Sequence, residues 1–290
     1  MGGFLRRHKR VVPYLLLAPG LLWLIVFFVV PGLQMFLTSF WSGTLETGYE
    51  FALSNISNYT TALARFAPQF IRSIIYGGAA TLLTFAISYP LAYTIAFRGG
   101  RFKNLLLFLV VAPFFTSFLL RTLSWKIILG DTGMILGPLQ QVGLLPDEFR
   151  LLATPIAVIF GITYNFLPFM TLPIYVSLEK VDRRLVEAAE DLFATSFGAF
   201  RRVTLPLSLP GVFAGSLLTF IPAMGDYVNA ELLGSPDTTM IGNVIQNQFL
   251  TQNNYPTASA LSFLLMAGIL IAVAVYARLL GTDELTAGGV

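Results

Sequence analysis

The sequence contains no cysteine, a single histidine (His8) and few charged residues. Charged residues make up 11% of the 290 positions, whereas soluble domains carry roughly 25%. With no thiolate and one imidazole, the composition disfavours a zinc site and excludes a disulfide scaffold. Hydrophobic residues account for 56% of the chain, which excludes an ordinary soluble enzyme and a disordered chain.

Motifs of common nucleotide and hydrolase sites are also missing. The chain has no G-x-x-x-x-G-K-[ST] phosphate loop, no H-E-x-x-H and no G-x-S-x-G. A Ser-His-Asp triad would have to use His8, and Asp226 is the one plausible acid at bilayer depth. We therefore expect no catalytic residue, no metal site and no enzymatic activity on this chain.

Six stretches are apolar and long enough to cross a bilayer, because a helix needs roughly 20 such residues to span the hydrocarbon core. The fifth is the weakest, since it holds proline, glycine and Asp226. We predict an all-α fold of six transmembrane helices, forming one membrane domain over residues 1–290. The stretches are residues 14–37, 74–97, 105–129, 151–176, 209–227 and 258–280.

The distribution of Lys and Arg predicts the orientation, because basic residues concentrate in cytoplasmic loops. With the basic tail of residues 1–13 in the cytoplasm, thirteen of the 18 Lys and Arg fall on the inside. Six spans then return the C-terminus to the cytoplasm. Topology and lipid headgroups explain the basic clusters, so we expect no binding to nucleic acid.

The longest inside segment, residues 178–208, predicts a helix-turn-helix. Asp182 can cap a first helix, and Thr195 or Ser196 can cap a second. Pro206 and Pro210 are expected to break the second helix before the fifth span. Periodicity alone leaves open a hairpin that lies on lipid headgroups. Apolar residues gather on one face of the first helix at Leu185, Ala189, Leu192 and Phe193.

The run Glu187-Ala188-Ala189, followed at family spacing by Val203-Thr204-Leu205-Pro206, resembles the EAA loop of ABC importer permeases. Phe193 departs from the pattern, because the family usually has glycine there. The resemblance implies that the hairpin docks on a cytoplasmic ATPase subunit, which binds ATP and Mg²⁺, while this chain binds no cofactor. The implied coupling residues are Glu187, Ala188, Ala189, Asp191, Leu205 and Pro206.

Residues 113–135, 167–182 and 209–249 further resemble permeases of spermidine/putrescine importers. This implies polyamine import by alternating access across the bacterial cytoplasmic (inner) membrane. The implied partners are an ATPase dimer, a second homologous permease and an extracytoplasmic substrate-binding protein. Alternatives are another solute, such as ferric iron, thiamine or another organic amine, and a stand-alone secondary transporter. The sequence shows no clear internal repeat, which favours a half-pore with a partner.

Ionisable and aromatic residues near the outer ends of the spans are candidates for the substrate pathway. Carboxylates at Asp226 and Glu231 would attract ammonium groups, although either could instead pair with Arg121 or Lys126. Arg121 itself either lines the pathway or holds helices together. The remaining candidates offer cation–π or polar contacts, or serve as interfacial and core residues: Trp125, Tyr164, Tyr227 and Asn165.

Overall fold

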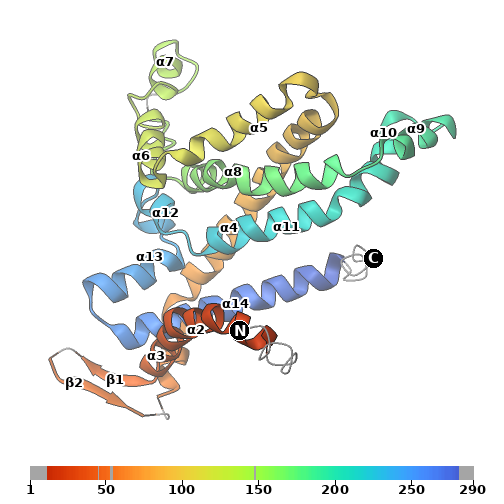
Figure 1. The fold of residues 1–290 in the computed structure, drawn as a ribbon. Helices are drawn as coiled ribbons and strands as arrows, with labels where there is room; N and C mark the ends of the chain where they lie inside the picture. The colour runs from red at the N-terminus through yellow and green to blue at the C-terminus, as the bar shows by residue number, and fades with distance from the viewer. Residues whose placement is uncertain (1–11, 45, 53–54, 147, 281–290) are drawn as a thin grey trace. The chain divides into compact units, whose positions relative to one another are not determined.

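The computed structural model describes residues 12–44, 46–52, 55–146 and 148–280, most of which are helical (Figure 1). Most of the basic tail, residues 1–11, lies outside the described residues. The α-helices are Val12–Leu24 (α2), Val30–Thr38 (α3), Ser57–Arg98 (α4), Lys103–Val111 (α5), Phe118–Ile128 (α6), Leu136–Gln141 (α7), Pro155–Glu179 (α8), Arg183–Asp191 (α9), Ser196–Ala199 (α10), Leu205–Met224 (α11), Val228–Leu233 (α12), Ile241–Gln246 (α13) and Tyr255–Leu280 (α14).

Short turns of other helix types and one β-hairpin complete the fold. The 3-10 turns are Gly100–Phe102 (η2), Ala112–Phe115 (η3) and Pro236–Thr238 (η5), and the π-helical turns are Ile25–Val29 (η1), Phe200–Thr204 (η4) and Asn247–Thr251 (η6). Strand β1 (Trp41–Thr44) pairs antiparallel with β2 (Gly48–Phe51). With so little sheet, the predicted all-α class is confirmed.

Within the described part of the chain, five helices have the length and apolar composition of membrane spans. Gly100–Phe115 and Phe118–Ile128 meet the same criterion as a pair and give a sixth span if counted together. The predicted number of spans is therefore confirmed. The five continuous helices are Leu16–Thr38, Ser57–Arg98, Pro155–Glu179, Ser196–Met224 and Tyr255–Arg278.

The third span is not the straight helix expected over residues 105–129. Its two halves meet at 93°, because the chain leaves the helical conformation at Thr116 and Ser117. The Thr116 N–H and hydroxyl both donate to the Pro113 carbonyl, at 3.1 and 2.7 Å. After this 3-10 turn, Thr116 and Ser117 have ψ values of 148° and 137°, which interrupt the helix. Hydropathy therefore located the span but not its break.

The second span begins earlier than expected. Helix α4 starts at Ser57 rather than near residue 74, so residues 57–73, which lie before the expected span, are helical. A helix of 42 residues is about 63 Å long, twice the roughly 30 Å hydrocarbon core. Hydropathy identified only the part of α4 that is apolar enough to lie in the bilayer.

The fifth span is longer than expected, and the predicted break at Pro206 and Pro210 is wrong. Helix continues from Ser196 to Met224 through the π turn η4. Pro206 is the second residue of α11 and directly follows the π turn, so it lies inside the continuous helical segment. Pro210 lies inside α11, as membrane helices tolerate when neighbouring groups satisfy the backbone.

The described chain divides into two compact units. In the smaller unit, residues up to Arg65 pack with Asn247–Leu264. Its interactions include the Phe36 and Phe263 rings at 5.2 Å and a 2.6 Å hydrogen bond between the Ser39 and Tyr59 hydroxyls.

The larger unit, Phe66–Gln246 with Leu265–280, is centred on the α8–α11 pair. Two glycines one turn apart let these helices touch along their backbones. A Cβ at Gly211 would lie 2.5 Å from the Pro173 carbonyl oxygen, and one at Gly215 would lie 3.0 Å from that of Met170. Small residues spaced in this way allow close packing in lipid. The pair therefore forms the rigid centre of this unit.

Candidate functional site

The predicted helix-turn-helix is confirmed as α9 and α10, beyond the ends of α8 and α11 (Figure 1). Asp182 caps α9, because its carboxylate accepts a 3.0 Å hydrogen bond from the Arg184 N–H. Thr195, rather than Ser196, caps α10 by accepting one of 3.1 Å from the Gly198 N–H. These caps satisfy backbone donors that the first helical turns leave unpaired.

The coupling residues taken from the EAA resemblance fall into two places. Glu187, Ala188 and Asp191 are exposed on α9, with Ala189 half-buried beside them. The other two, Leu205 and Pro206, are half-buried at the start of α11. Leu205 packs against the core cluster that includes Tyr89, Ile174 and Leu178. The exposed α9 residues are accessible to a partner. Leu205, in contrast, packs the start of α11, which continues from α10, against the spanning helices.

Phe193 occupies the glycine position of the EAA pattern and has a φ of 62°. Its N–H donates to the Glu190 carbonyl at 2.9 Å, and the Ala194 N–H donates to that of Ala189 at 3.1 Å. This pair of bonds is a Schellman motif, which usually places glycine in the left-handed position. The turn is thus kept despite the substitution, at a backbone cost of roughly 1–2 kcal/mol.

Aromatic rings connect the hairpin to the spanning helices. Phe197 stacks on Phe200 at 6.3 Å, and Phe200 packs edge-on against Tyr89 at 5.8 Å and Tyr93 at 5.9 Å. The Tyr89 hydroxyl forms a 2.7 Å hydrogen bond with Ser208 on α11. Sequence reasoning missed this connection, because nothing local indicates that Phe200 turns toward α4.

Asp226 is the centre of a buried polar network at the start of α12. Its carboxylate accepts hydrogen bonds from the backbone N–H of Asn229 at 2.8 Å and from its side-chain amide at 2.6 Å. Asn165 on α8 donates to Asn229 Oδ1 and to the Thr122 hydroxyl, both at 3.2 Å. The network therefore joins α6, α8 and α12 around two of the predicted pathway residues.

The other pathway candidates surround this network within the larger unit. Asn243 donates to the Tyr227 carbonyl at 2.9 Å and to the exposed Glu231 carboxylate at 3.2 Å. The Trp125 ring packs edge-on against Tyr164 at 5.2 Å. Both rings are half-buried.

Neither carboxylate forms the ion pair that the sequence left open. Ion pairs in the described ranges include Lys103–Glu179 and Arg150–Asp131. Arg121 is 8% exposed and lies over the Phe114 and Phe118 rings, at 5.7 and 5.8 Å. Its Nε and Nη1 atoms have no hydrogen-bond partner in the described chain. Arg121 therefore holds aromatic rings on both sides of the 93° bend.

Thr122, Asn229 and Asn243 were not among the sequence candidates. Asp226 itself carried a usable signal, because an Asp at the start of a helix often accepts the backbone N–H three residues later, here that of Asn229. No signal in the sequence indicates Thr122 or Asn243, because their hydrogen-bond partners in the network lie on other helices.

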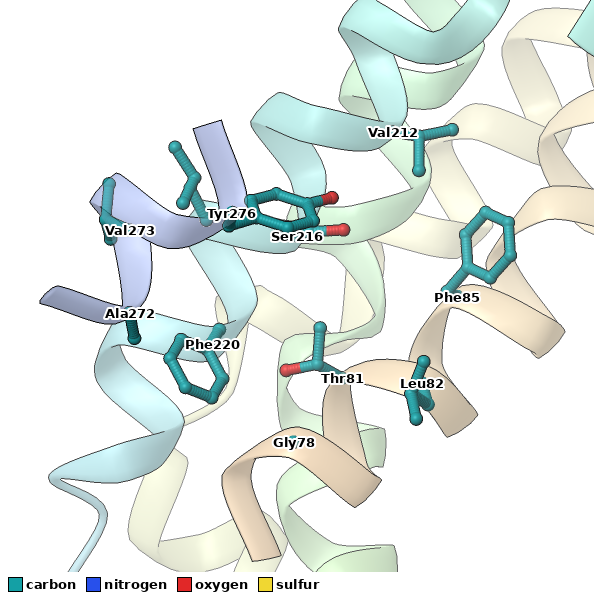
Figure 2. Close-up of a pocket in the computed structure, with 11 residues that line it drawn as sticks. Gly78, Thr81, Leu82, Phe85, Val212, Ser216, Phe220, Ala272, Val273 and Tyr276 are labelled. Carbon is teal, nitrogen blue, oxygen red and sulfur yellow. The ribbon is translucent and has the colours of Figure 1, made fainter. Parts of the chain in front are cut away.

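A separate cavity of about 390 Å³ lies among α4, α11 and α14. Figure 2 shows side chains from these three helices around it. Hydroxyls at Thr81, Ser216 and Tyr276 are the polar side-chain groups in a lining without charged residues. Aromatic rings at Phe85, Phe220 and Tyr276 also line it, but it contains no carboxylate to neutralise an ammonium group. Because burying an unpaired charge is costly, this cavity suits apolar groups better than a polycation.

These features define a multi-pass helical membrane protein with an amphipathic hairpin at the ends of α8 and α11. The model of the family described as binding-protein-dependent transport system inner membrane component matches residues 88–280. The chain belongs to this family, so it is a multi-pass component of an inner-membrane transport system rather than an enzyme.

Relatives of known function support this assignment. The chain is 41% identical over 257 residues to the spermidine/putrescine transport system permease protein PotB of Haemophilus influenzae, covering 88% of this chain and 90% of that protein. It is 36% identical to the protein of the same name in Escherichia coli, covering 88% and 93%.

Solved structures share the fold. A bacterial ABC transporter involved in the import of the acidic polysaccharide alginate contains a chain that matches with a TM-score of 0.75 at 20% identity. That match covers 95% of this chain and 97% of the other. A second alginate transporter structure, in complex with an alginate-bound periplasmic protein, matches with a TM-score of 0.69 at 19% identity, covering 97% and 98%.

Proposed function

We propose that this chain is the permease subunit of an ATP-driven importer of spermidine and putrescine. The observation that carries the proposal is the 41% identity to a spermidine/putrescine permease over 88% of the chain. The alginate transporters share the fold of this chain, but their solute differs in charge from the proposed one, because alginate is acidic and polyamines are cationic. The choice of solute therefore rests on the relatives and on the polar residues around α12.

The residues around α12 suit a polycation. Glu231 is exposed and would attract an ammonium group first, because opposite charges raise local concentration and association rate. Trp125, Tyr164 and Tyr227 offer ring faces for cation–π contacts, worth about 0.5–2 kcal/mol each. Asp226 is 7% exposed, so its carboxylate would become available only when the contact of α6, α8 and α12 opens.

The proposed coupling passes through the hairpin. An ATPase dimer would bind ATP and Mg²⁺ and contact Glu187, Ala188, Ala189 and Asp191, and its closure would move α9 and α10. The aromatic connection from Phe197 through Phe200 to Tyr89 would carry that movement to α4. Rigid elements with two arrangements can transmit closure in this way.

The proposed assembly needs three further kinds of subunit. A second homologous permease would complete the pore, and a binding protein would deliver the polyamine to the outer face. Both termini of this chain would lie in the cytoplasm, as the excess of inside Lys and Arg predicts.

Reconstitution tests the proposal. The chain, its ATPase, the second permease and the binding protein would be placed in proteoliposomes, and uptake of labelled putrescine and spermidine measured with and without ATP. We expect ATP-dependent accumulation that requires all four components. Accumulation of ferric iron, thiamine or another organic amine instead of polyamines would support the alternative solute. Polyamine uptake by the chain alone would support a stand-alone secondary transporter.

A further inference from the structure

The turn between α9 and α10 presents an apolar surface, which we name the hairpin tip: Leu192, Phe193 and Phe197. Their exposed fractions are 81%, 98% and 71%. Phe193 therefore contributes almost nothing to packing within the chain. Three large apolar side chains at one exposed turn are typical of an interaction site.

The strained backbone at Phe193 indicates that its side chain has a function that glycine could not provide. Both hydrogen bonds of the turn are made by backbone groups, so glycine at position 193 would keep them and remove the strain of a φ of 62°. An aromatic residue in the left-handed region is disfavoured, and strain of this kind clusters at functional sites. Since the side chain stabilises neither the turn nor the core, its use lies outside this chain.

The charges beside the tip distinguish a protein partner from a lipid surface. Glu187, Glu190 and Asp191 are exposed on α9 next to the tip. The cytoplasmic leaflet carries a negative surface potential, which repels carboxylates.

Arg183 lies on the same face of α9, four residues before Glu187, but its guanidinium donates back to the Ala96 and Phe97 carbonyls of α4 at 3.3 Å each. Arg201 and Arg202 are exposed on η4. Charges of both signs therefore surround the tip, which suits a protein surface better than a uniformly negative leaflet.

We infer that Phe193 is an anchor that inserts into an apolar pocket with a basic rim on the cytoplasmic ATPase subunit. The inference rests on the proposed ATPase partner and adds a contact beyond the Glu187–Ala189 motif. Phe193 fills the pocket, while Glu187, Glu190 and Asp191 face the basic rim. A buried aromatic surrounded by polar contacts is the usual arrangement of an interface anchor. Phe193 thereby selects an ATPase that has such a pocket.

Two substitutions separate the side chain from the strain. Phe193→Gly removes both, whereas Phe193→Ala removes the ring and keeps the left-handed residue. Binding of the purified ATPase to the full-length permease in nanodiscs would be measured by titration. We expect both variants to raise Kd about tenfold or more, as loss of a buried aromatic anchor does. Leu144→Ala, an exposed apolar change elsewhere in the chain, is the matched control and leaves Kd unchanged.

The outcomes separate this inference from the proposed function. If the wild-type permease binds no ATPase, the proposed function fails. If the wild type binds, Glu187→Lys weakens binding and both Phe193 variants bind as the wild type does, the anchor is refuted while the function stands.

A third variant tests a lipid occupant. Phe193→Cys supplies the single cysteine of the chain, since the sequence has none. We expect rapid maleimide alkylation in nanodiscs containing anionic lipid and at least tenfold slower alkylation once saturating ATPase is added. Slow alkylation in those nanodiscs without ATPase would place the tip in lipid and overturn the inference.

Discussion

Asp226 has both carboxylate oxygens occupied by Asn229, so it closes the first turn of α12, as a cap does, in addition to its proposed role in the substrate pathway. If Asp226 both closes the first turn of α12 and binds the polyamine, substitutions that affect only one of these roles should change uptake to different extents. We expect Asp226→Asn to lower uptake of labelled putrescine tenfold or more, since hydrogen bonds to charged groups contribute about 1.5–3 kcal/mol. Asn229→Ala is the control, because it disturbs the cap and keeps the charge. Equal loss of uptake in both variants would assign the effect to the geometry of the network.

At Phe193 the expected change is local and stabilising. Replacing it with glycine should favour the folded turn by about 1 kcal/mol, because glycine adopts the left-handed conformation without a steric penalty. The observable is hydrogen exchange at the Ala194 amide, which donates to the Ala189 carbonyl. Protection there should rise about fivefold, and unchanged or lower protection would contradict the strain.

At the scale of elements, the α8–α11 contact depends on the absence of side chains. We expect Gly211→Ala to destabilise the protein by about 1–3 kcal/mol, because a Cβ there meets the Pro173 carbonyl oxygen at 2.5 Å. Gly78→Ala on α4 is the matched control, since its Cβ would meet nothing within 4 Å. Thermal unfolding in detergent compares the two, and equal unfolding temperatures would contradict the close packing.

The sequence predicted the elements whose signals are local. Hydrophobic length located the spans, and the caps at Asp182 and Thr195 located the hairpin. The break at Thr116 and Ser117 was missed because their neighbours are as apolar as those of a continuous span. The extension of α4 to Ser57 was missed because its first turns have the composition of a loop.

The candidate site was predicted by residue type but not by arrangement. Carboxylates and aromatics near the outer ends were recognised, and the structure brings Asp226 and Asn165 together through Asn229. Their connection requires α6, α8 and α12 to meet, which depends on tertiary packing. Sequence alone could not decide on the alternative of ion pairs with Arg121 for the same reason, and in the structure Arg121 lies over Phe114 and Phe118.

For the whole molecule, coupling should be lost without loss of the membrane fold. Glu187 is exposed, so Glu187→Lys should leave insertion and stability unchanged, as surface substitutions usually do. If Glu187 contacts the ATPase as proposed, we expect reduced copurification of the ATPase and reduced polyamine uptake, because the substitution reverses the charge at that contact. Unchanged uptake and unchanged copurification would contradict the role of the hairpin.

The π turn at Phe200–Thr204 fixes the direction in which the hairpin points. Its Leu205 N–H donates to the Phe200 carbonyl, so the turn holds one residue more than an α-helical turn. Each residue of an α-helix advances the chain by about 100° around the axis. Deleting one residue there would rotate α9 and α10 by about a quarter turn relative to α11, with both halves still folded. The proposed ATPase partner would then meet a different side of a correctly folded hairpin, so the single extra residue of η4 would determine how the hairpin is aligned with that partner.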